Sequence, residues 1–302
     1  MPMLDFRVET FLAVCRHMNF TKAARELNIT QPAVSHHMHY LEQAYGTALF
    51  QHNGKRLQLT EAGEILRRTL MTMKHDEQHL QKRMQQVASG TRDYSFGATL
   101  SVAEFMINEA LGRFPRLHPD SHIQMQVADT KVLLSKLDSG ELDFAVVEGD
   151  FPKAEYDFFV FGTEEYVAAG DPEKAARYRG RRLTDLLGEP LLLREEGSGT
   201  RVILEYYLKE HGLAAADFAR TVEIGNIGAI KTLLKSGYGV SFLYRAAIRP
   251  EEAAGALGVI ELSDFELRHD IMFRFPKNSN FRADYTTIFR ELRACAEETG
   301  GA

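Results

Sequence analysis

The 302-residue sequence is poor in cysteine: Cys15 and Cys295 are its only two, and they lie far apart. Two distant cysteines provide no disulfide framework, which is typical of a reducing compartment. No apolar run reaches the roughly 18 residues that a membrane span requires. The opening residues, MPMLDFRVETF, include an acidic residue and lack the basic-then-apolar pattern of a secretory signal. These absences predict a cytoplasmic protein that does not enter a membrane.

The sequence also lacks the common catalytic motifs. It contains no Walker-type phosphate loop, zinc motif, Gly-x-Ser-x-Gly elbow or dinucleotide fingerprint. Ser198 has no histidine close to it in the sequence, so no nucleophile–base pair is visible. We therefore expect a protein that is not an enzyme and needs no cofactor.

Charge is distributed unevenly along the chain, whose net charge is −6. Residues 1–90 hold 11 Lys and Arg against 8 Asp and Glu, a net charge of +3. The remaining 25 basic and 34 acidic residues give residues 91–302 a net charge of −9. The N-terminal part is therefore the region that permits a phosphate-binding surface.

The first 45 residues carry the pattern of three helices. Apolar side chains recur at helical spacing over residues 4–15, which predicts an amphipathic helix with Cys15 in its core face. Thr21 is expected to cap a second short helix, and Thr30 a third whose first turn holds Pro32, where proline loses no hydrogen bond. A short helix, a turn and a longer helix with a polar outer face predict a helix-turn-helix, whose second helix enters the DNA major groove.

The third helix carries three histidines, His36, His37 and His39. Neighbouring residues on a helix point about 100° apart, and His36 with His39 lacks a third ligand at metal-binding spacing. A metal site is therefore not expected. The favoured interpretation is hydrogen bonding on a DNA-facing helix, and solvated side chains on an exposed face are the alternative.

Residues 49–60 follow as a hairpin. LFQH and RLQLT predict two short strands around an Asn-Gly turn, the strongest short hairpin signal. Lys55 and Arg56 come directly after the turn, so the hairpin resembles a wing suited to phosphates. The stretch AARELNITQPAVSHHMHYLEQAYGTALF…LTEAG resembles the winged helix-turn-helix of LysR-type transcriptional regulators, although that family usually has arginine where this chain has His36 and His52. The predicted DNA contacts are Thr21, Lys22, Thr30, Gln31, Pro32, Ser35, His36, His39, Asn53, Lys55 and Arg56.

Residues 61–89 predict one long linker helix. Leu66, Met73, Leu80 and Val87 recur every seven residues, and Leu70 and Met84 lie four beyond two of them, which predicts a dimer seam interrupted at Glu77. A helix packed on its own domain is the alternative. The predicted dimerisation residues are Leu66, Leu70, Met73, Leu80 and Met84. The resemblance implies the same linker helix, and dimers joined into tetramers.

Residues 90–302 alternate between strand and helix patterns, which is typical of parallel α/β sheets. Two such sets, with crossovers expected near residues 161–165 and 266–270, predict lobe I at 92–162 and 268–302, and lobe II at 163–267. The segments HPDSHIQMQVADT, LDSGELDFAVVEG, EEGSGTR and AIKTLLKSGYGVSFL resemble the effector-binding domain of the same family. The resemblance implies an α/β multidomain protein: a winged helix-turn-helix at 1–60, the linker helix, and a two-lobed domain similar to periplasmic binding proteins.

Four strand-to-helix junctions are candidates for an effector site, because ligands bind open α/β sheets beyond the carboxyl ends of the strands. Helix capping alone is the alternative for Ser198, Thr200 and Asp129, and Asp129 would repel a carboxylate. Glu148, at the end of a buried strand, is not included. The predicted residues are Thr99, Leu100, Ser101, Asp129, Thr130, Ser198, Gly199, Thr200, Asn226 and Ile227.

The sequence thus predicts a transcriptional regulator with double-stranded DNA, a small polar or carboxylate-bearing effector and a second copy of the chain as partners. RNA polymerase is a further possible partner. A small-solute-binding protein without enzymatic activity is the alternative. It fits residues 92–302 but leaves the winged helix unexplained.

Overall fold

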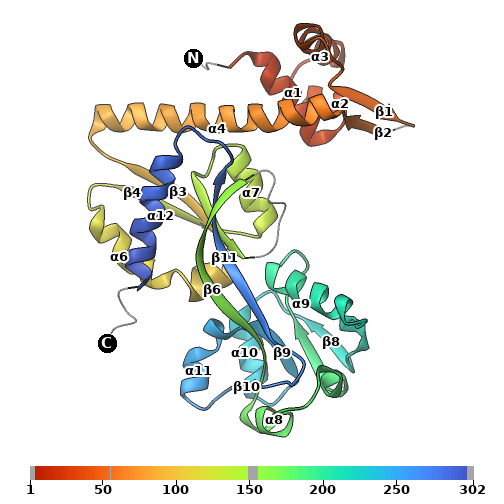
Figure 1. The fold of residues 1–302 in the computed structure, drawn as a ribbon, viewed down its shortest axis with the longest axis vertical. Helices are drawn as coiled ribbons and strands as arrows, with labels where there is room; N and C mark the ends of the chain where they lie inside the picture. The colour runs from red at the N-terminus through yellow and green to blue at the C-terminus, as the bar shows by residue number, and fades with distance from the viewer. Residues whose placement is uncertain (1–3, 55, 149–155, 298–302) are drawn as a thin grey trace. The chain divides into compact units, whose positions relative to one another are not determined.

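The computed structural model describes residues 4–54, 56–148 and 156–297. The chain divides into two compact units. The N-terminal unit consists of Met1–Gly90 with two short excursions, Asp138–Glu141 and Pro276–Arg282, and the effector unit contains the rest. Figure 1 shows the elements of both.

Three helices open the N-terminal unit: α1 (Phe6–His17), α2 (Phe20–Glu26) and α3 (Gln31–Tyr45). Their small core includes Phe11, Ala23 and Val34, all fully buried. Cys15 packs against this core, and burial raises the pKa of its thiol to about 12. The predicted inner faces of these helices are confirmed.

The predicted N-cap of α3 is confirmed, whereas the predicted N-cap of α2 is wrong. The Thr30 hydroxyl accepts a hydrogen bond from the Ala33 N–H, as expected for the cap of α3. The cap of α2 is Asn19 instead of Thr21, because the Asn19 side chain accepts the Lys22 N–H at 2.9 Å and the helix already begins at Phe20. Thr21 therefore lies inside the first turn.

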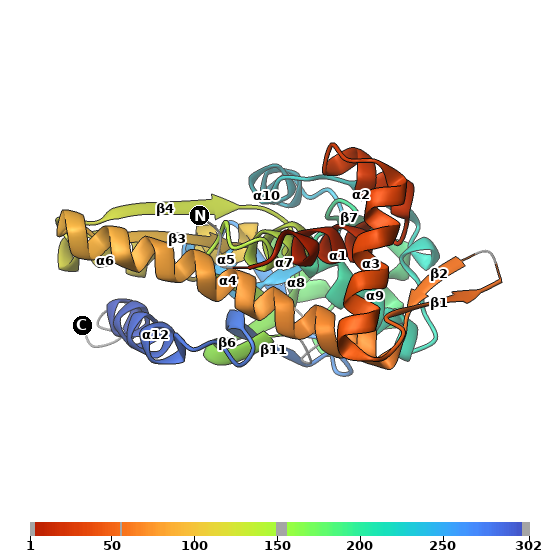
Figure 2. The same ribbon diagram turned by 90° about the horizontal axis from the view of Figure 1, so that it is seen from above.

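The predicted hairpin is confirmed. Strands β1 (Phe50–Asn53) and β2 (Arg56–Leu59) pair antiparallel, with Asn53 opposite Arg56. Gly54 has a φ of 62°, a left-handed conformation that favours glycine at this turn. Figure 2 shows α3 and the hairpin near the same end of α4 (Glu61–Ser89).

Helix α4 begins with a close backbone approach. Thr60 caps it through the Gly63 N–H, and a Cβ on Gly63 would overlap the carbonyl oxygen of Leu49. Glycine at this position therefore lets α4 pack directly against the residue that precedes the wing.

Further along α4, the second excursion of the N-terminal unit is bonded to the helix. The Asp76 carboxylate is buried and accepts hydrogen bonds from the Ser279 hydroxyl and from both the backbone and the side-chain N–H of Asn280. The Thr72 hydroxyl donates to the Lys277 carbonyl at 2.9 Å. These hydrogen bonds anchor residues 277–280 to α4. The sequence pattern did not indicate this contact.

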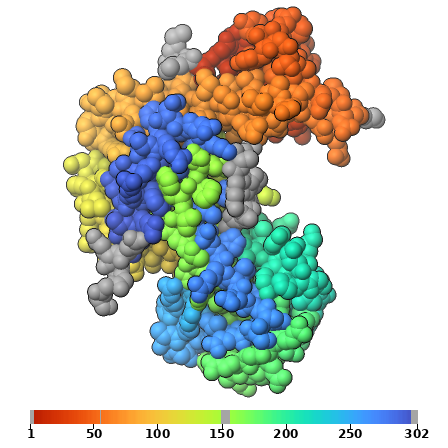
Figure 3. Space-filling model, in the orientation of Figure 1, coloured from red at the N-terminus to blue at the C-terminus, as the bar shows by residue number. Residues whose placement is uncertain are grey.

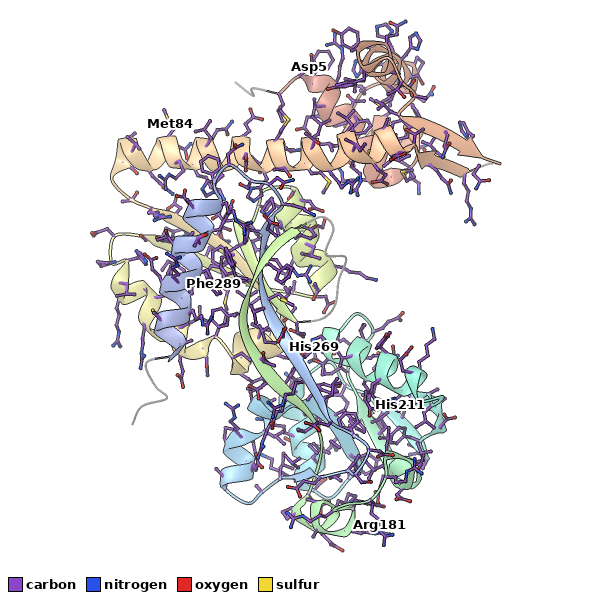
Figure 4. All side chains as sticks on the ribbon, viewed as in Figure 1. Asp5, Met84, Arg181, His211, His269 and Phe289 are labelled. Carbon is purple, nitrogen blue, oxygen red and sulfur yellow. The ribbon has the colours of Figure 1, made fainter. Side chains whose placement is uncertain are left out.

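The predicted dimer seam requires a correction at its start. Leu70 is only 4% exposed and Leu66 packs beside it in the winged-helix core, so these two leucines join α4 to its own domain. Met73, Leu80 and Met84 remain exposed, and Met84 is 65% exposed. Figure 4 marks Met84 near the C-terminal end of α4. The seam available to a second chain therefore begins at Met73.

The first lobe of the effector unit is built on parallel strands. It contains β3 (Asp93–Ala98), α5 (Leu100–Phe105), α6 (Asn108–Leu117), β4 (His122–Val127), α7 (Thr130–Asp138), β5 (Phe144–Glu148) and α12 (Arg282–Glu297). Strand β3 lies between β4 and β5 and pairs parallel with both. Helices α5 and α6 follow β3 in succession, with Met106 and Ile107 between them.

The second lobe repeats this arrangement. It contains α8 (Pro172–Arg177), β7 (Pro190–Leu193), α9 (Gly199–Glu210), β8 (Arg220–Glu223), α10 (Ile227–Lys235), β9 (Val240–Tyr244), α11 (Arg249–Ala253), β10 (Gly258–Ile260) and the 3₁₀ turns η1 (Leu183–Gly188), η2 (Ala215–Asp217) and η3 (Arg245–Ala247). Strand β7 lies between β8 and β9 and pairs parallel with both.

Two long strands, β6 (Tyr156–Gly170) and β11 (Leu267–Pro276), join the lobes. The C-terminal part of β6 pairs antiparallel with β9 and β10, and that of β11 with β5. Figure 3 shows them side by side as green and blue surface, and Figure 4 marks His269 on β11. Strand β6 was not expected from the sequence, although the predicted crossovers fall within β6 and at the start of β11. Across the described ranges, no helix is long and apolar enough to cross a membrane.

Candidate DNA-binding surface and effector cleft

The outer face of α3 carries the polar side chains that the sequence placed there. Gln31, Pro32, His36 and His39 are exposed, and Ser35 is half-buried. The Gln31 amide donates to the Ser35 hydroxyl at 2.9 Å, and His39 and Gln43 are hydrogen-bonded at the same distance. Hydroxyl, amide and imidazole groups at adjacent turns are the groups that contact base edges in a major groove.

His37 has a different place from its two neighbours. Its Nδ1 lies 2.9 Å from the Thr10 hydroxyl of α1, and its ring packs edge-on against Phe6. Burial, together with the positive charge of Arg7, lowers the pKa of His37. His37 therefore joins α3 to α1 and leaves His36 and His39 as the outward pair.

The predicted contacts on α2 and the wing are also exposed. Thr21 and Lys22 lie in the first turn of α2, and Asn53 and Arg56 flank the hairpin turn. Lys55 lies outside the described residues. Arg56 thus presents a fixed positive charge at the wing, which suits a phosphate contact.

In the effector unit, the first and second predicted junctions surround a buried carboxyl group. Thr99 precedes α5, and its hydroxyl donates a hydrogen bond to Oε2 of Glu148, the last residue of β5. Glu148 is only 2% exposed, and burial raises its pKa; the Thr99 bond and the Arg194 charge lower it only in part. Glu148 is therefore a buried acid, with a raised pKa, in the middle of the predicted site.

The third junction lies against the first across the two lobes. The Ser101 and Thr200 hydroxyl oxygens are 3.1 Å apart, and both residues are buried. The Tyr166 hydroxyl donates to the carbonyl of Thr200 at 2.8 Å. Neither Ser198 nor Thr99 uses its side chain as a helix cap. The capping alternative therefore does not describe Ser198, and the Thr200 hydroxyl bonds to the opposite lobe.

Charged residues border these hydroxyls. A Cβ on Gly197 would lie 3.2 Å from an oxygen of Asp129, so the Asp129 carboxylate approaches the Gly197–Thr200 turn. Arg194, at the end of β7, binds Glu195 through two hydrogen bonds of 2.7 Å. Arg194 thus binds Glu195 and lowers the pKa of Glu148 in part, while Asp129 approaches the Gly197–Thr200 turn.

The fourth junction contributes less than expected. Asn226 caps α10 by accepting the Ala229 N–H at 2.9 Å. Ile227 is 1% exposed and packs in the core of the second lobe with Ile230 and Leu234, so its side chain is not available to a ligand. The expectation for the Ile227 side chain is corrected, because the first residue of α10 points inward.

Three buried polar atoms around the cleft have no hydrogen-bond partner among the described residues: Thr130 Oγ1, Arg194 Nη1 and Tyr244 Oη. Of these, only Thr130 was predicted from the sequence. Glu148 was considered and not included, and Arg194, Tyr166 and Tyr244 were not predicted, although Arg194 directly follows a buried strand, which is a usable signal. Unsatisfied buried donors are uncommon in folded proteins and mark places where a further group binds.

Comparison with known proteins assigns both units. The model "Bacterial regulatory helix-turn-helix protein, lysR family" matches residues 7–64, and "LysR substrate binding domain" matches residues 89–294. The chain belongs to the LysR family. This LysR-type transcriptional regulator is 27% identical to the "RuBisCO operon transcriptional regulator" of Acidithiobacillus ferrooxidans, over 97% of this chain and 94% of the relative. It is 30% identical to the "HTH-type transcriptional activator CmpR" of Synechocystis, over 86% and 85%.

Solved structures share the fold of this LysR-type regulator. Full-length LysG of Corynebacterium glutamicum, solved with bound effector Arg, covers 98% of this chain and 99% of its own, with a TM-score of 0.62 and 19% identity. The regulatory domain of CcmR from Synechocystis, in complex with 2-PG, covers 68% and 98%, with a TM-score of 0.60 and 20% identity. The predicted two-part architecture is thereby confirmed.

Proposed function

We propose that this LysR-type regulator reads double-stranded DNA with the outer face of α3 and contacts phosphates with the wing. Gln31, His36 and His39 are exposed on one helix face, and Arg56 provides a charge beside it. Because a single helix face reads only a few base pairs, two copies joined through Met73, Leu80 and Met84 would recognise a two-part site. The cytoplasm is the compartment where such a regulator meets DNA.

The cleft between the two lobes is the proposed effector site. One observation carries this proposal: hydroxyls from opposite lobes, Ser101 and Thr200, meet at 3.1 Å while Thr130, Arg194 and Tyr244 each keep a buried polar atom unsatisfied. A small polar effector would satisfy these atoms and bring the lobes together. Linked dimers, as tetramers, and a contact with RNA polymerase would complete a regulatory response.

The DNA-binding proposal is tested with a fragment of the gene's own upstream DNA. Gln31→Ala combined with His39→Ala should weaken the mobility shift of that fragment about tenfold or more, because two base contacts are lost. His211→Ala, which removes an exposed histidine in the effector unit, is the control and should leave the shift unchanged. Equal shifts for all three proteins would remove α3 from the interface.

The cleft proposal is tested by Thr200→Val, which keeps the shape of the side chain but removes the hydroxyl. Its affinity for an effector found by a thermal-shift screen should fall by about 1–3 kcal/mol in calorimetry. DNA binding without effector should persist. If affinity is unchanged in a folded variant, the Thr200 hydroxyl serves only its bond to Ser101.

A further inference from the structure

The position of the Glu148 carboxyl restricts what the cleft can accept. Oε2 receives the Thr99 hydroxyl, and a Cβ on Gly199 would lie 3.1 Å from both Cγ and Oε1 of Glu148. Gly199 is the first residue of α9, a helix of 12 residues whose N-terminal N–H groups favour a negative group. The protein's own carboxyl therefore fills the place beside α9 that the carboxylate of an effector would otherwise take.

The other ionisable groups around Glu148 favour a positive ligand. The Asp129 carboxylate, which follows β4 in the first lobe, approaches the Gly197 turn of the second lobe, and its negative charge contributes to the raised pKa of Glu148. The nearby positive charge is Arg194, and its guanidinium is already bound to Glu195 through two hydrogen bonds. Among the residues that the structure describes, no lysine or arginine is hydrogen-bonded to Glu148 or Asp129.

Tyrosine and threonine hydroxyls are the other polar groups of the proposed site. Tyr166 donates to the carbonyls of Thr200 and Phe242, so its proton is already used. The buried Tyr244 hydroxyl, whose pKa burial and the Glu148 charge both raise, has no hydrogen-bond partner in the part of the chain that the structure describes. The same holds within the described ranges for the buried Thr130 Oγ1. Both hydroxyls can accept as well as donate a hydrogen bond, so both can receive an N–H group.

We propose that Glu148 selects the effector, which is a small molecule with an ammonium, amidinium or guanidinium group held by Glu148 and Asp129. This proposal rests on the cleft being the effector site and narrows the expected effector from polar or carboxylate-bearing to cationic. A carboxylate is excluded from the end of the cleft beside α9 because Glu148 occupies that place and Asp129 repels it. The Thr130 and Tyr244 hydroxyls receive the remaining N–H groups.

Proton release accompanies such binding. Burial raises the pKa of Glu148, and a cation is held better by the carboxylate form, so a bound cation lowers this pKa and releases a proton at any pH where Glu148 is protonated in the free protein. Affinity for a cation therefore rises with pH until Glu148 is ionised in the free protein. Calorimetry in two buffers with different ionisation enthalpies measures the number of protons released per ligand.

The test uses the full chain with three cationic probes, agmatine, L-arginine and putrescine, and two anionic probes, malonate and inorganic phosphate. At least one cationic probe should raise the melting temperature of the wild type at millimolar concentration. Its affinity should fall about tenfold or more in Glu148→Ala, as for the loss of a charge-assisted hydrogen bond. Glu148→Gln should lose the proton release. Glu173→Ala, an exposed glutamate on α8, is the matched control.

The anionic probes test the exclusion directly. Malonate or phosphate should stabilise Glu148→Ala more than the wild type, because that variant empties the place beside α9. The proposal is wrong if no cationic probe stabilises the wild type, or if malonate binds the wild type as tightly as it binds Glu148→Ala. Malonate binding that Thr200→Val weakens and Glu148→Ala leaves unchanged would keep the cleft as the effector site and remove Glu148 as its selecting residue.

Discussion

The two candidate sites hold their polar side chains in opposite ways. On α3, Gln31, His36 and His39 are exposed, and a small apolar core behind them sets the direction in which they point. In the cleft, Ser101, Glu148 and Thr200 are buried. The Ser101 and Thr200 hydroxyls are hydrogen-bonded to each other, and Glu148 accepts a hydrogen bond from Thr99. The surface site therefore depends on the integrity of its scaffold, whereas the cleft depends on individual polar atoms.

Each arrangement fits the partner proposed for it. DNA is large and presents many phosphates, so the loss of one exposed contact removes only a small part of the total binding free energy. A small molecule meets few groups, and a buried polar atom left without its partner costs about 1–3 kcal/mol. Changes to the scaffold should consequently matter most in the N-terminal unit, and changes to single polar groups should matter most in the cleft.

The largest expected effect comes from Gly63→Ala. Its Cβ would overlap the backbone carbonyl of Leu49, which has no freedom to withdraw as a side chain would. We expect a loss of about 3 kcal/mol in the stability of the N-terminal unit, together with loss of DNA binding, measured by calorimetry and mobility shift. Gly112→Ala on the exposed face of α6 has open space and should stabilise by about 0.5–1 kcal/mol. Similar effects for the two substitutions would contradict the close approach.

The next effect concerns the exposed apolar row on α4. Leu80→Glu places a charge between Met73 and Met84, so a dimer paired through this row should weaken by about 2 kcal/mol, roughly thirtyfold in its dissociation constant. Analytical ultracentrifugation measures this. Gln81→Glu adds the same charge about 100° around the helix and should have little effect. Undisturbed dimers in Leu80→Glu would place the dimer contact elsewhere.

A smaller effect is expected at the wing. Arg56→Gln removes one exposed cation, so the slope of log affinity against log salt should become shallower by about 0.9. Affinity should fall only severalfold, and equally for operator and unrelated DNA. Lys209→Gln removes the same charge from the effector unit and is the control. An unchanged salt slope would exclude Arg56 from phosphate contact.

The last prediction concerns pH and stability. Because burial raises the pKa of Glu148 above its ordinary value of 4.5, the folded chain binds more protons than the unfolded chain above that pH. The contribution of Glu148 to stability is therefore highest at acidic pH and falls as pH rises from 4.5 towards the raised value. Glu148→Gln should gain stability over the wild type from pH 5 to pH 8, measured by urea unfolding. A difference that does not vary with pH would mean that Glu148 is already ionised.

The sequence predicted the elements whose pattern is local. The heptad row and the Asn-Gly turn were enough to define α4 and the wing, since helix periodicity and turn chemistry act over a few residues. The assignment of Leu70 to a dimer seam failed because an apolar side chain on a helix packs equally well on its own chain, and periodicity does not distinguish the two partners.

The cleft was predictable only where a junction carries its own polar residues. Thr99, Ser101 and Thr200 follow strands and were predicted in this way, and the structure bonds Thr99 to Glu148 and Ser101 to Thr200. Tyr166 and Tyr244 were missed because they lie within strands, where an aromatic residue normally belongs to the core, and only the pairing of β6 with β9 brings them together. Thr21 was chosen over Asn19 as the cap of α2 because the start of the helix was placed two residues too late.

The anchor at Asp76 has a mechanical consequence. Strand β11 ends at Pro276, and only Lys277 and Asn278 separate it from Ser279, the first residue bonded to the Asp76 side chain. Two residues span at most about 7 Å, so the tether between the strand that joins the lobes and the linker helix is short. A ligand that draws β11 along its axis by more than this tether allows must therefore either break the buried bonds of Asp76 or pull on α4 itself.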